Sequence, residues 1–342
     1  MNDRQSAILG TLLGTAVGDA LGLPYEGLSR RRVAALGEVR HRLLLGRGLC
    51  SDDTEHTLML AAALRTNPGD VREFQRCFAW KLRWWLLGFP AGVGLGTARA
   101  VLRLWLGFPP HKAGVTSAGN GAAMRSAVVG VFWADEETKR REFARAACRL
   151  THTDPRAEES ALLVAEAAAL ASNHATTERV LSHLSALILS AEMKSRFEVL
   201  EAALASGSSV LDFATRIGCE RGVSGFAPNT VAVALFAWLR HRGDLASALR
   251  SVIACGGDTD TVAAITGGIG GAEVGEAGIP QDWIESIGDW PRSVTHIRNV
   301  ATAMSDNSKS MPNVFWPFVL LRNGVFLALV LLHGSRRLFP PY

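Results

Sequence analysis

The sequence predicts an all-α protein, and three observations support that fold class. Apolar residues recur at three- and four-residue spacing in eight segments, 5–22, 57–66, 74–88, 138–152, 155–173, 195–206, 230–242 and 244–257. Apolar residues make up 48% of the chain and charged residues 20%, a composition typical of a folded globule. Alternating strand patterns are absent from the sequence, and Gly, Pro, Asn and Asp clusters between the segments indicate short connections.

A single domain is predicted for residues 1–342, because no Pro/Ser-rich linker or low-complexity run divides the chain. We expect residues 291–342 to form a C-terminal helical extension packed on that domain. Its apolar stretch is interrupted by Pro317, Arg322 and Asn323, which leaves about ten apolar residues where a membrane span needs about twenty. The tail is therefore predicted to be a buried helix and not a membrane span, with interfacial membrane contact as the alternative.

Composition excludes several functional classes. The net charge is +4, and basic triplets at 30–32 and 139–141 are scattered, so we expect no obligate nucleic-acid partner. The five cysteines are odd in number and form no C-x-x-C pair, which argues against a disulfide framework and a zinc site. The nine tryptophans are expected to pack in the core. The first residues lack a signal pattern, so we expect a cytoplasmic protein. We also expect the protein to be a monomer.

Two acidic runs open apolar helices, and each admits two interpretations. In "SDDT" (51–54), Ser51 or Asp52 could cap the helix, with Asp52 and Glu55 as a capping box; "GGDTDT" (256–261) could cap in the same way. Alternatively, the hydroxyls and carboxylates are hard oxygen ligands for divalent cations. Four carboxylates facing one point would repel one another unless cations lay between them, which makes a pair of ions plausible. Spacing alone does not show that the runs meet.

Five motifs occur in a fixed order, "GTAVGDALGLPYE" (14–26), "SDDT" (51–54), "SAGNGAAMR" (117–125), "THTDPRA" (151–157) and "GGDTDTVAAITGGIGGA" (256–272). In this combination the chain resembles the ADP-ribosylglycohydrolase family. The resemblance implies an all-α domain with a binuclear site for two Mg²⁺ (or Mn²⁺) ions. It also implies hydrolysis at C1 of the distal ribose of ADP-ribose, with an ADP-ribosylated protein as substrate, most often modified on arginine. The alternative is a non-catalytic ADP-ribose-binding or toxin-neutralising immunity protein on the same scaffold.

The resemblance also assigns site residues by position. The implied metal ligands are Ser51, Asp52, Asp53, Asp258, Asp260 and Thr261. The family usually has threonine where this chain has Ser51, and the hydroxyl is retained. Glu26 and Asp53 are the two candidate catalytic carboxylates, either of which could take the proton of the attacking water, although Glu26 could also be an ordinary turn residue. Asp19 is expected to brace the site.

The substrate side is assigned to "SAGNGAAMR". Gly119 and Gly121 permit close backbone approach to a pyrophosphate, while Ser117 and Asn120 offer donors, although the same pattern is common in turns. His152 could contact ADP-ribose or cap the helix that begins near Pro155.

Two further glycine-containing segments complete the expectations. "GVGLGT" (92–97) follows "WWLLGFPA" and not a β-strand, so it implies no nicotinamide cofactor and is expected to border the substrate cleft. Ala264, Gly268, Gly271 and Ala272 are expected to let a neighbouring element approach the helix of the second acidic run closely.

Overall fold

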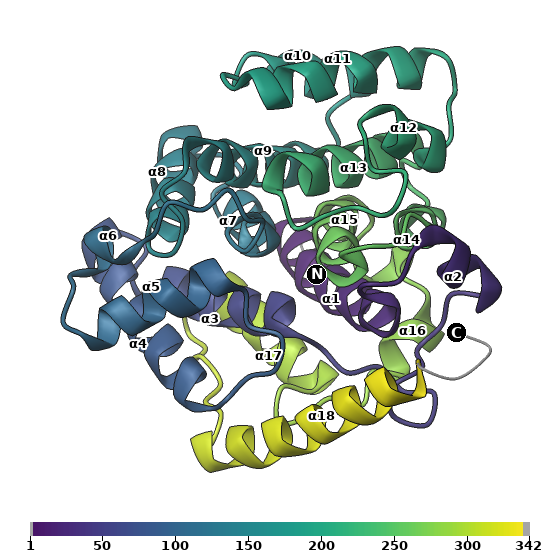
Figure 1. The fold of residues 1–342 in the computed structure, drawn as a ribbon. Helices are drawn as coiled ribbons and strands as arrows, with labels where there is room; N and C mark the ends of the chain where they lie inside the picture. The colour runs from purple at the N-terminus through teal and green to yellow at the C-terminus, as the bar shows by residue number, and fades with distance from the viewer. Residues whose placement is uncertain (1–2, 338–342) are drawn as a thin grey trace.

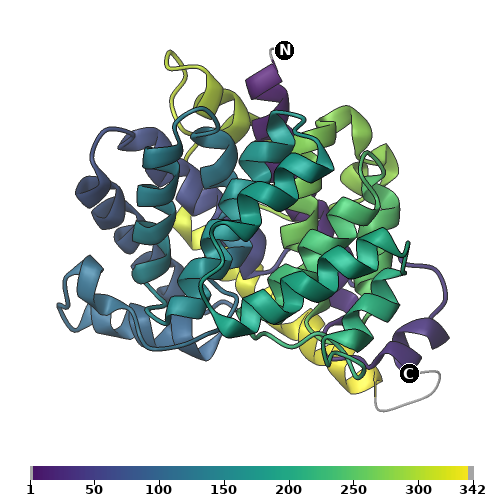
Figure 2. The same ribbon diagram turned by 90° about the horizontal axis from the view of Figure 1, so that it is seen from above.

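The computed structural model describes residues 3–337, and these form a helical assembly (Figures 1 and 2). The helices are α1 (Asp3–Gly22), α2 (Arg30–Ala35), α3 (Asp52–Thr66), α4 (Val71–Leu87), α5 (Leu95–Trp105), α6 (Pro110–Ala113), α7 (Ala127–Phe132), α8 (Glu137–Arg149), α9 (Pro155–Ser172), α10 (Thr177–Ser185), α11 (Ala191–Ala205), α12 (Val210–Arg216), α13 (Ala227–Arg240), α14 (Leu245–Ala254), α15 (Thr259–Val274), α16 (Gln281–Glu285), α17 (Val294–Ser305) and α18 (Trp316–Arg336). Within the described residues, extended backbone pairs only as isolated bridges.

The predicted all-α class is confirmed for this part of the chain. Each of the eight apolar-periodic segments coincides with a helix, and the boundaries differ by a few residues at most, except at 57–66. There the helix begins earlier, at Asp52, because the acidic run forms its first turn. All five cysteines are free thiols.

The centre of the fold is an antiparallel pair of apolar helices, α1 and α15, packed backbone to backbone. A Cβ on Gly14 would lie 2.1 Å from the carbonyl oxygen of Gly267, and one on Gly10 would lie 2.1 Å from that of Gly271. Only glycine permits such an approach. As predicted, small residues of the second-run helix, Gly271 among them, make this contact. The contact also brings Gly22, at the end of α1, against Thr259 at the start of α15.

The prediction for the C-terminal tail is confirmed in its helix and wrong in its burial. Residues Trp316–Arg336 form one continuous helix, α18, because Pro317 lies in the first turn, where a missing N–H costs nothing. Two helices of the described chain are long and apolar enough to cross a membrane, one beginning at Asp3 and one spanning Trp316–Arg336; their apolar stretches are 94% and 22% buried. Figure 1 shows α18 lying along the outside of the helical assembly. The last residues of the predicted extension, 338–342, lie outside the described chain.

The tryptophan prediction is wrong in part. Trp85 and Trp238 are fully buried, as expected, but Trp80, Trp84 and Trp105 are exposed. These three lie on α4 and α5, and a fourth exposed tryptophan, Trp290, lies between α16 and α17 and contacts Phe318 of α18.

Candidate functional site

A pair of glycines sets the position of the second acidic run. Gly256 and Gly257 have φ angles of 67° and 85°, which favour glycine, and a Cβ on Gly257 would lie 2.1 Å from the carbonyl oxygen of Val223. The Gly257 N–H donates to the Leu28 carbonyl at 2.8 Å, and the Asp258 N–H donates to that of Val223 at 2.8 Å. The start of α15 is therefore held between two chain segments.

The start of α3 is held by its own cap and by Asp19. The Asp53 N–H donates to Ser51 Oγ at 3.3 Å, so Ser51 caps the helix. Asp19, at the end of α1, accepts from the Ser51 N–H at 2.9 Å and from the Thr54 N–H at 3.1 Å. Burial, partly offset by these bonds, raises the pKa of Asp19 to about 6. Asp19 thus braces the first run.

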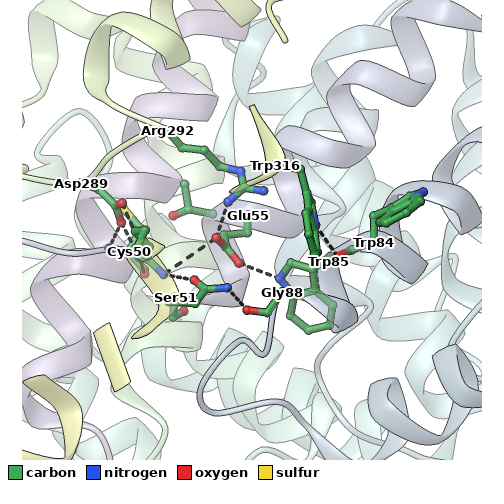
Figure 3. Close-up of polar contacts among 12 residues, drawn as sticks. Cys50, Ser51, Glu55, Trp84, Trp85, Gly88, Asp289, Arg292 and Trp316 are labelled. Atoms are coloured by element: carbon green, nitrogen blue, oxygen red, sulfur yellow. Dashed lines mark hydrogen bonds and ion pairs between the residues drawn. The ribbon is translucent and has the colours of Figure 1, made fainter. Parts of the chain in front are cut away.

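The capping-box interpretation of Asp52 and Glu55 is wrong. The Glu55 carboxylate turns away from the helix start, accepts from Trp85 Nε1 at 2.6 Å and pairs with Arg292 (Figure 3). Figure 3 also shows Cys50 beside Asp289, whose carboxylate accepts from the Cys50 N–H at 2.9 Å. Buried partners on the far side of α3 therefore fix the segment that leads into the acidic run.

The two acidic runs, which are 208 residues apart at their point of contact, meet in the structure. Thr261 Oγ1 on α15 donates to Asp53 Oδ2 on α3 at 3.2 Å, and Ser51 Oγ donates to the same oxygen at 3.0 Å. This contact is a consequence of the α1–α15 packing, which brings the start of α15 beside the end of α1, while Asp19 ties the start of α3 to the same place.

Asp258 does not behave as a helix cap. It occupies the N-cap position of α15, yet its side chain accepts no capping bond. Instead Asp258 Oδ2 accepts from Asn120 Nδ2 at 2.7 Å, and the same amide group reaches Thr230 Oγ1 at 3.1 Å. The capping interpretation thus holds for Ser51 but not for Asp258. Asn120, predicted on the substrate side, holds this carboxylate.

Two buried carboxylate oxygens at the meeting point have no hydrogen-bond partner, Asp53 Oδ1 and Asp260 Oδ1. The Asp53 and Asp260 residues are 1% and 5% exposed. Burial raises the pKa of both carboxyls well above the ordinary value, and repulsion from neighbouring acids, Asp258 among them, raises it further. Burial and the repulsion of Asp19 and Glu55 raise the pKa of Asp52 to about 8. Unpaired buried carboxylates are costly, so these groups require protons or a cation.

The donor set fits a divalent cation in chemistry but is not a closed cage. Among residues 3–337, no three His, Cys, Asp or Glu side chains converge closely enough to hold an ion by themselves. The two orphaned oxygens are nevertheless aspartate oxygens beside hydroxyls, the hard ligands that Mg²⁺ and Mn²⁺ prefer. The residues therefore fit such an ion, and solvent or substrate oxygens would fill its remaining coordination positions.

Glu26 lies at the exposed edge of this cluster. It follows the short helical turn Leu23–Tyr25, and its neighbour Gly27 donates its N–H to the Gly257 carbonyl at 2.7 Å. Partial loss of solvent and repulsion from Asp258 raise the pKa of Glu26, against the attraction of Arg337. Glu26 is thus an accessible carboxylate facing the second acidic run.

His152 forms a second wall with three glycines. Asp154, not His152, caps α9 by accepting from the Arg156 N–H at 2.9 Å, so the capping interpretation of His152 is wrong. A Cβ on Gly96 would lie 3.1 Å from His152 Nε2, and one on Gly121 would lie 3.1 Å from Cε1. Burial and Arg125 lower the pKa of His152 to about 3, so the ring is neutral at physiological pH.

The remaining predicted substrate residues surround the same ring. Ser117 Oγ accepts from the Gly119 N–H at 3.3 Å, and it would lie 3.0 Å from a Cβ on Gly96. The "GVGLGT" loop, through Gly96, therefore borders the "SAGNG" loop. No bond between Ser117 and the acidic runs is recorded among the described residues, so the wall and the acidic cluster are joined through Asn120.

Arg125 is a structural member of this wall that the sequence analysis did not single out. Its guanidinium is fully buried, and it donates to the Gly121 carbonyl at 2.8 Å and to Thr151 Oγ1 at 2.6 Å. Thr151 Oγ1 in turn contacts His152 Nδ1 at 2.8 Å. Burial lowers the pKa of Arg125 to about 10, which leaves it charged. An arginine within the small apolar run "GAAMRSAVV" was the available signal.

Comparisons with known proteins show which family the chain resembles along most of its length. Residues 1–311 match the family model of ADP-ribosylglycohydrolase. The chain is 28% identical over 82% of its length to the ADP-ribosyl-[dinitrogen reductase] glycohydrolase of Rhodospirillum rubrum, covering 89% of it. It is 26% identical over 87% of its length to the ADP-ribosylarginine hydrolase Tri1 of Pseudomonas putida, covering 78%. A solved ADP-ribosylglycohydrolase-related protein complex matches with a TM-score of 0.69 and 29% identity, over 89% of this chain and 98% of that one.

Proposed function

The chain belongs to the ADP-ribosylglycohydrolase family of enzymes, and from that premise we propose that it removes ADP-ribose from arginine side chains of modified proteins, with two Mg²⁺ or Mn²⁺ ions bound. The finer assignment to arginine is supported by the likeness to the arginine-directed hydrolase of Pseudomonas putida along most of the chain.

One observation carries the proposal. Asp53 Oδ1 and Asp260 Oδ1, from helices far apart in the sequence, are buried without partners at the place where Thr261 contacts Asp53. A purely structural helix start would use its acids for caps or ion pairs. Two unsatisfied carboxylates at one point indicate a site built to receive cations.

The residues that would hold the ions are Ser51, Asp52 and Asp53 on α3 and Asp258, Asp260 and Thr261 on α15. Bound Mg²⁺ or Mn²⁺ would supply Lewis-acid stabilisation and would orient the distal ribose hydroxyls and a water near C1. Asn120 fixes the Asp258 carboxylate by its 2.7 Å bond, and Asp19 fixes the start of α3. The positions of the ligands therefore depend on the Asn120 amide and on the Asp19 carboxylate.

Glu26 is the better placed of the two candidate bases. A base must accept a proton from water and return it to solvent, and Glu26 is exposed whereas Asp53 is 1% exposed. Asp53 Oδ2 also already accepts from Ser51 and Thr261. We therefore assign the proton transfer to Glu26, with Asp53 kept as a ligand.

The wall of Ser117, Gly119, Gly121 and His152 would bind the ADP-ribose. Glycines let backbone N–H groups approach a phosphate, and a neutral imidazole can donate a hydrogen bond without adding charge. Arg125 supports this wall from behind, since it holds the Gly121 carbonyl and Thr151.

The direct test is incubation of metal-supplemented protein with arginine-, serine- and nucleobase-linked ADP-ribose, followed by measurement of released ADP-ribose. Release from the arginine conjugate is expected, with little or none from the others. Preferred release from the serine or nucleobase conjugate would contradict arginine as the acceptor, while the assignment as a hydrolase would stand. Tight binding of ADP-ribose with no release from any conjugate would instead identify a non-catalytic ADP-ribose-binding or toxin-neutralising protein.

A further inference from the structure

The outward side of α18 is apolar, unlike that of an ordinary surface helix. The side packed on the protein carries Arg322, Asn323 and His333 together with the apolar Val319 and Phe326. The outward side carries Phe318, 50% exposed, and Leu321, 59% exposed, and continues through Val325, Leu331 and Leu332. In water, an amphipathic helix turns its polar side outward. An outward side of this kind is favoured where its surroundings are apolar or cover it.

Each inward polar side chain is satisfied by the protein. Arg322 Nε and a terminal nitrogen donate to Asp289 at 3.1 and 2.5 Å, and the same terminal nitrogen reaches the Cys50 carbonyl. Asn323 Nδ2 donates to the Gly88 carbonyl at 2.7 Å. His333 Nε2 lies 3.0 Å from the Pro24 carbonyl oxygen. These bonds fix the rotation of α18 about its axis, so the apolar side is held outward.

The apolar surface continues beyond α18. The ring of Trp316 lies 5.5 Å from that of Trp84 on α4, which lies 6.4 Å from that of Trp105 on α5. Phe318 contacts Trp290 at 6.0 Å. In residues 3–337, the large apolar side chains exposed outside segments 80–108 and 290–332 are Leu45, Leu189 and Leu211. The exposed apolar groups are thus concentrated on α18 and the segments near it.

The charge on the segments that form this surface is mostly positive, although Asp306 lies within 290–332 and Glu26 lies near Arg337 at one end of α18. No Asp or Glu occurs at residues 74–134 or 307–342, in a chain with 32 acidic residues. Basic residues remain in both segments, including Lys81, Arg103 and Arg336. At the C-terminal end of α18, Arg32 of α2 donates to the Arg337 carbonyl at 2.9 Å, which adds the basic triplet 30–32 to the rim.

We propose that the outward side of α18 binds the surface of an anionic lipid bilayer, with the helix lying in the plane of the interface. An apolar stripe flanked mainly by Lys and Arg has the chemistry that inserts among acyl chains while pairing with anionic headgroups. A second copy of this chain is disfavoured as the occupant because it would bring two largely basic surfaces together. The family match ends at residue 311, so α18 itself lies outside the matched segment, whereas Trp84, Trp105 and Trp290 lie within it.

An in-plane orientation follows from the inward contacts. To cross the bilayer as a separate span, α18 would have to release Arg322 from Asp289 and Asn323 from Gly88, and expose both to hydrocarbon. Lying on the surface keeps those bonds and buries only the outward side chains.

The test is flotation of the full-length protein with vesicles, with Leu321→Gln/Leu331→Gln as the variant and Leu189→Gln as the matched control. Leu189 is 91% exposed but lies away from α18. The parent and L189Q should float with phosphatidylcholine vesicles that contain about 30% phosphatidylglycerol, and at least about tenfold less with pure phosphatidylcholine or in high salt. The double variant should float on the order of tenfold less at an unchanged melting temperature, because two apolar anchors are lost.

Four results would overturn the proposal. The first two are failure of the unaltered protein to float at any composition and equal flotation with neutral vesicles. Elution as a dimer that the double variant separates would identify a second copy as the occupant. Resistance of the bound protein to alkaline extraction would identify a spanning helix. None of these outcomes bears on hydrolysis, so they are separate from a failure of the proposed activity.

Discussion

The two acidic helix starts look alike in the sequence and are used differently in the structure. At α3, Ser51 caps the helix and Asp19 holds the Ser51 and Thr54 N–H groups, so most of that start is satisfied by the protein. At α15, Asp258 accepts no capping bond and Asp260 keeps an unpartnered oxygen. Each start thus keeps one open carboxylate oxygen, Asp53 Oδ1 or Asp260 Oδ1, but the backbone of α3 is capped by its own Ser51 side chain and that of α15 is not.

The largest effect is expected from Asp260→Asn. If Asp260 is a ligand and not a structural acid, hydrolysis of ADP-ribosyl-arginine should fall by about 100-fold or more. The metal-free melting temperature should stay equal or rise, because one source of repulsion among buried carboxylates is removed. Asp282→Asn, at the exposed start of α16, is the matched control and should change neither quantity. A parental rate or a much lower melting temperature in D260N would break the comparison.

Metal binding provides the next largest effect. Mg²⁺ or Mn²⁺ should raise the melting temperature of EDTA-treated protein, since an ion that binds only the folded state contributes about 2.7 kcal/mol at a hundred times its Kd. D260N should lose most of this shift, while Asp282→Asn should keep it. Identical melting curves with and without metal would show that the open oxygens of α15 and α3 receive no cation.

The next prediction concerns His152, in the second wall of the site and outside both acidic helix starts, and the pH dependence of the free energy of unfolding. His152 has a folded-state pKa of about 3 against an ordinary value of 6.5, so the unfolded chain binds more protons between those values. Its contribution is fully present above pH 6.5 and is lost as the pH falls, by about 1–2 kcal/mol at pH 5. Urea unfolding of the parent and of His152→Gln at pH 7 and pH 5 measures it. An equal loss in both proteins would assign the dependence to other groups.

The smallest effect separates the two caps directly. Ser51→Ala should lower the free energy of unfolding of the metal-free protein by about 1 kcal/mol, because it removes a cap that bonds the Asp53 N–H. Asp258→Ala should not lower it, since Asp258 does not cap α15 and its Asn120 partner keeps Thr230. If both variants lose the same stability, the two helix starts are equivalent after all. Chemical denaturation in EDTA measures both values.

Most helices and the donor types of the site could be predicted from the sequence, whereas the bonding of each donor could not. Periodicity located α1, α9 and α13 to within a few residues. It gave no indication that Asn120 bonds to Asp258 or that Arg125 supports His152, because those partners lie far apart in the chain. The assignment of Glu55 to a capping box failed for the same reason, since Trp85 and Arg292 compete for its carboxylate.

The sequence by itself determined the helical class, the glycines that allow α1 and α15 to touch, and the oxygen donors at two helix starts, because these depend on residue type and local spacing. Only the tertiary structure decided which carboxylate oxygens remain open and which side of α18 faces outward. Both α1 and α18 are long and apolar, yet one is core and the other surface. The rotation of a helix about its axis is set by the partners it meets, such as Asp289 for Arg322, and local periodicity carries no information about partners so distant in the chain.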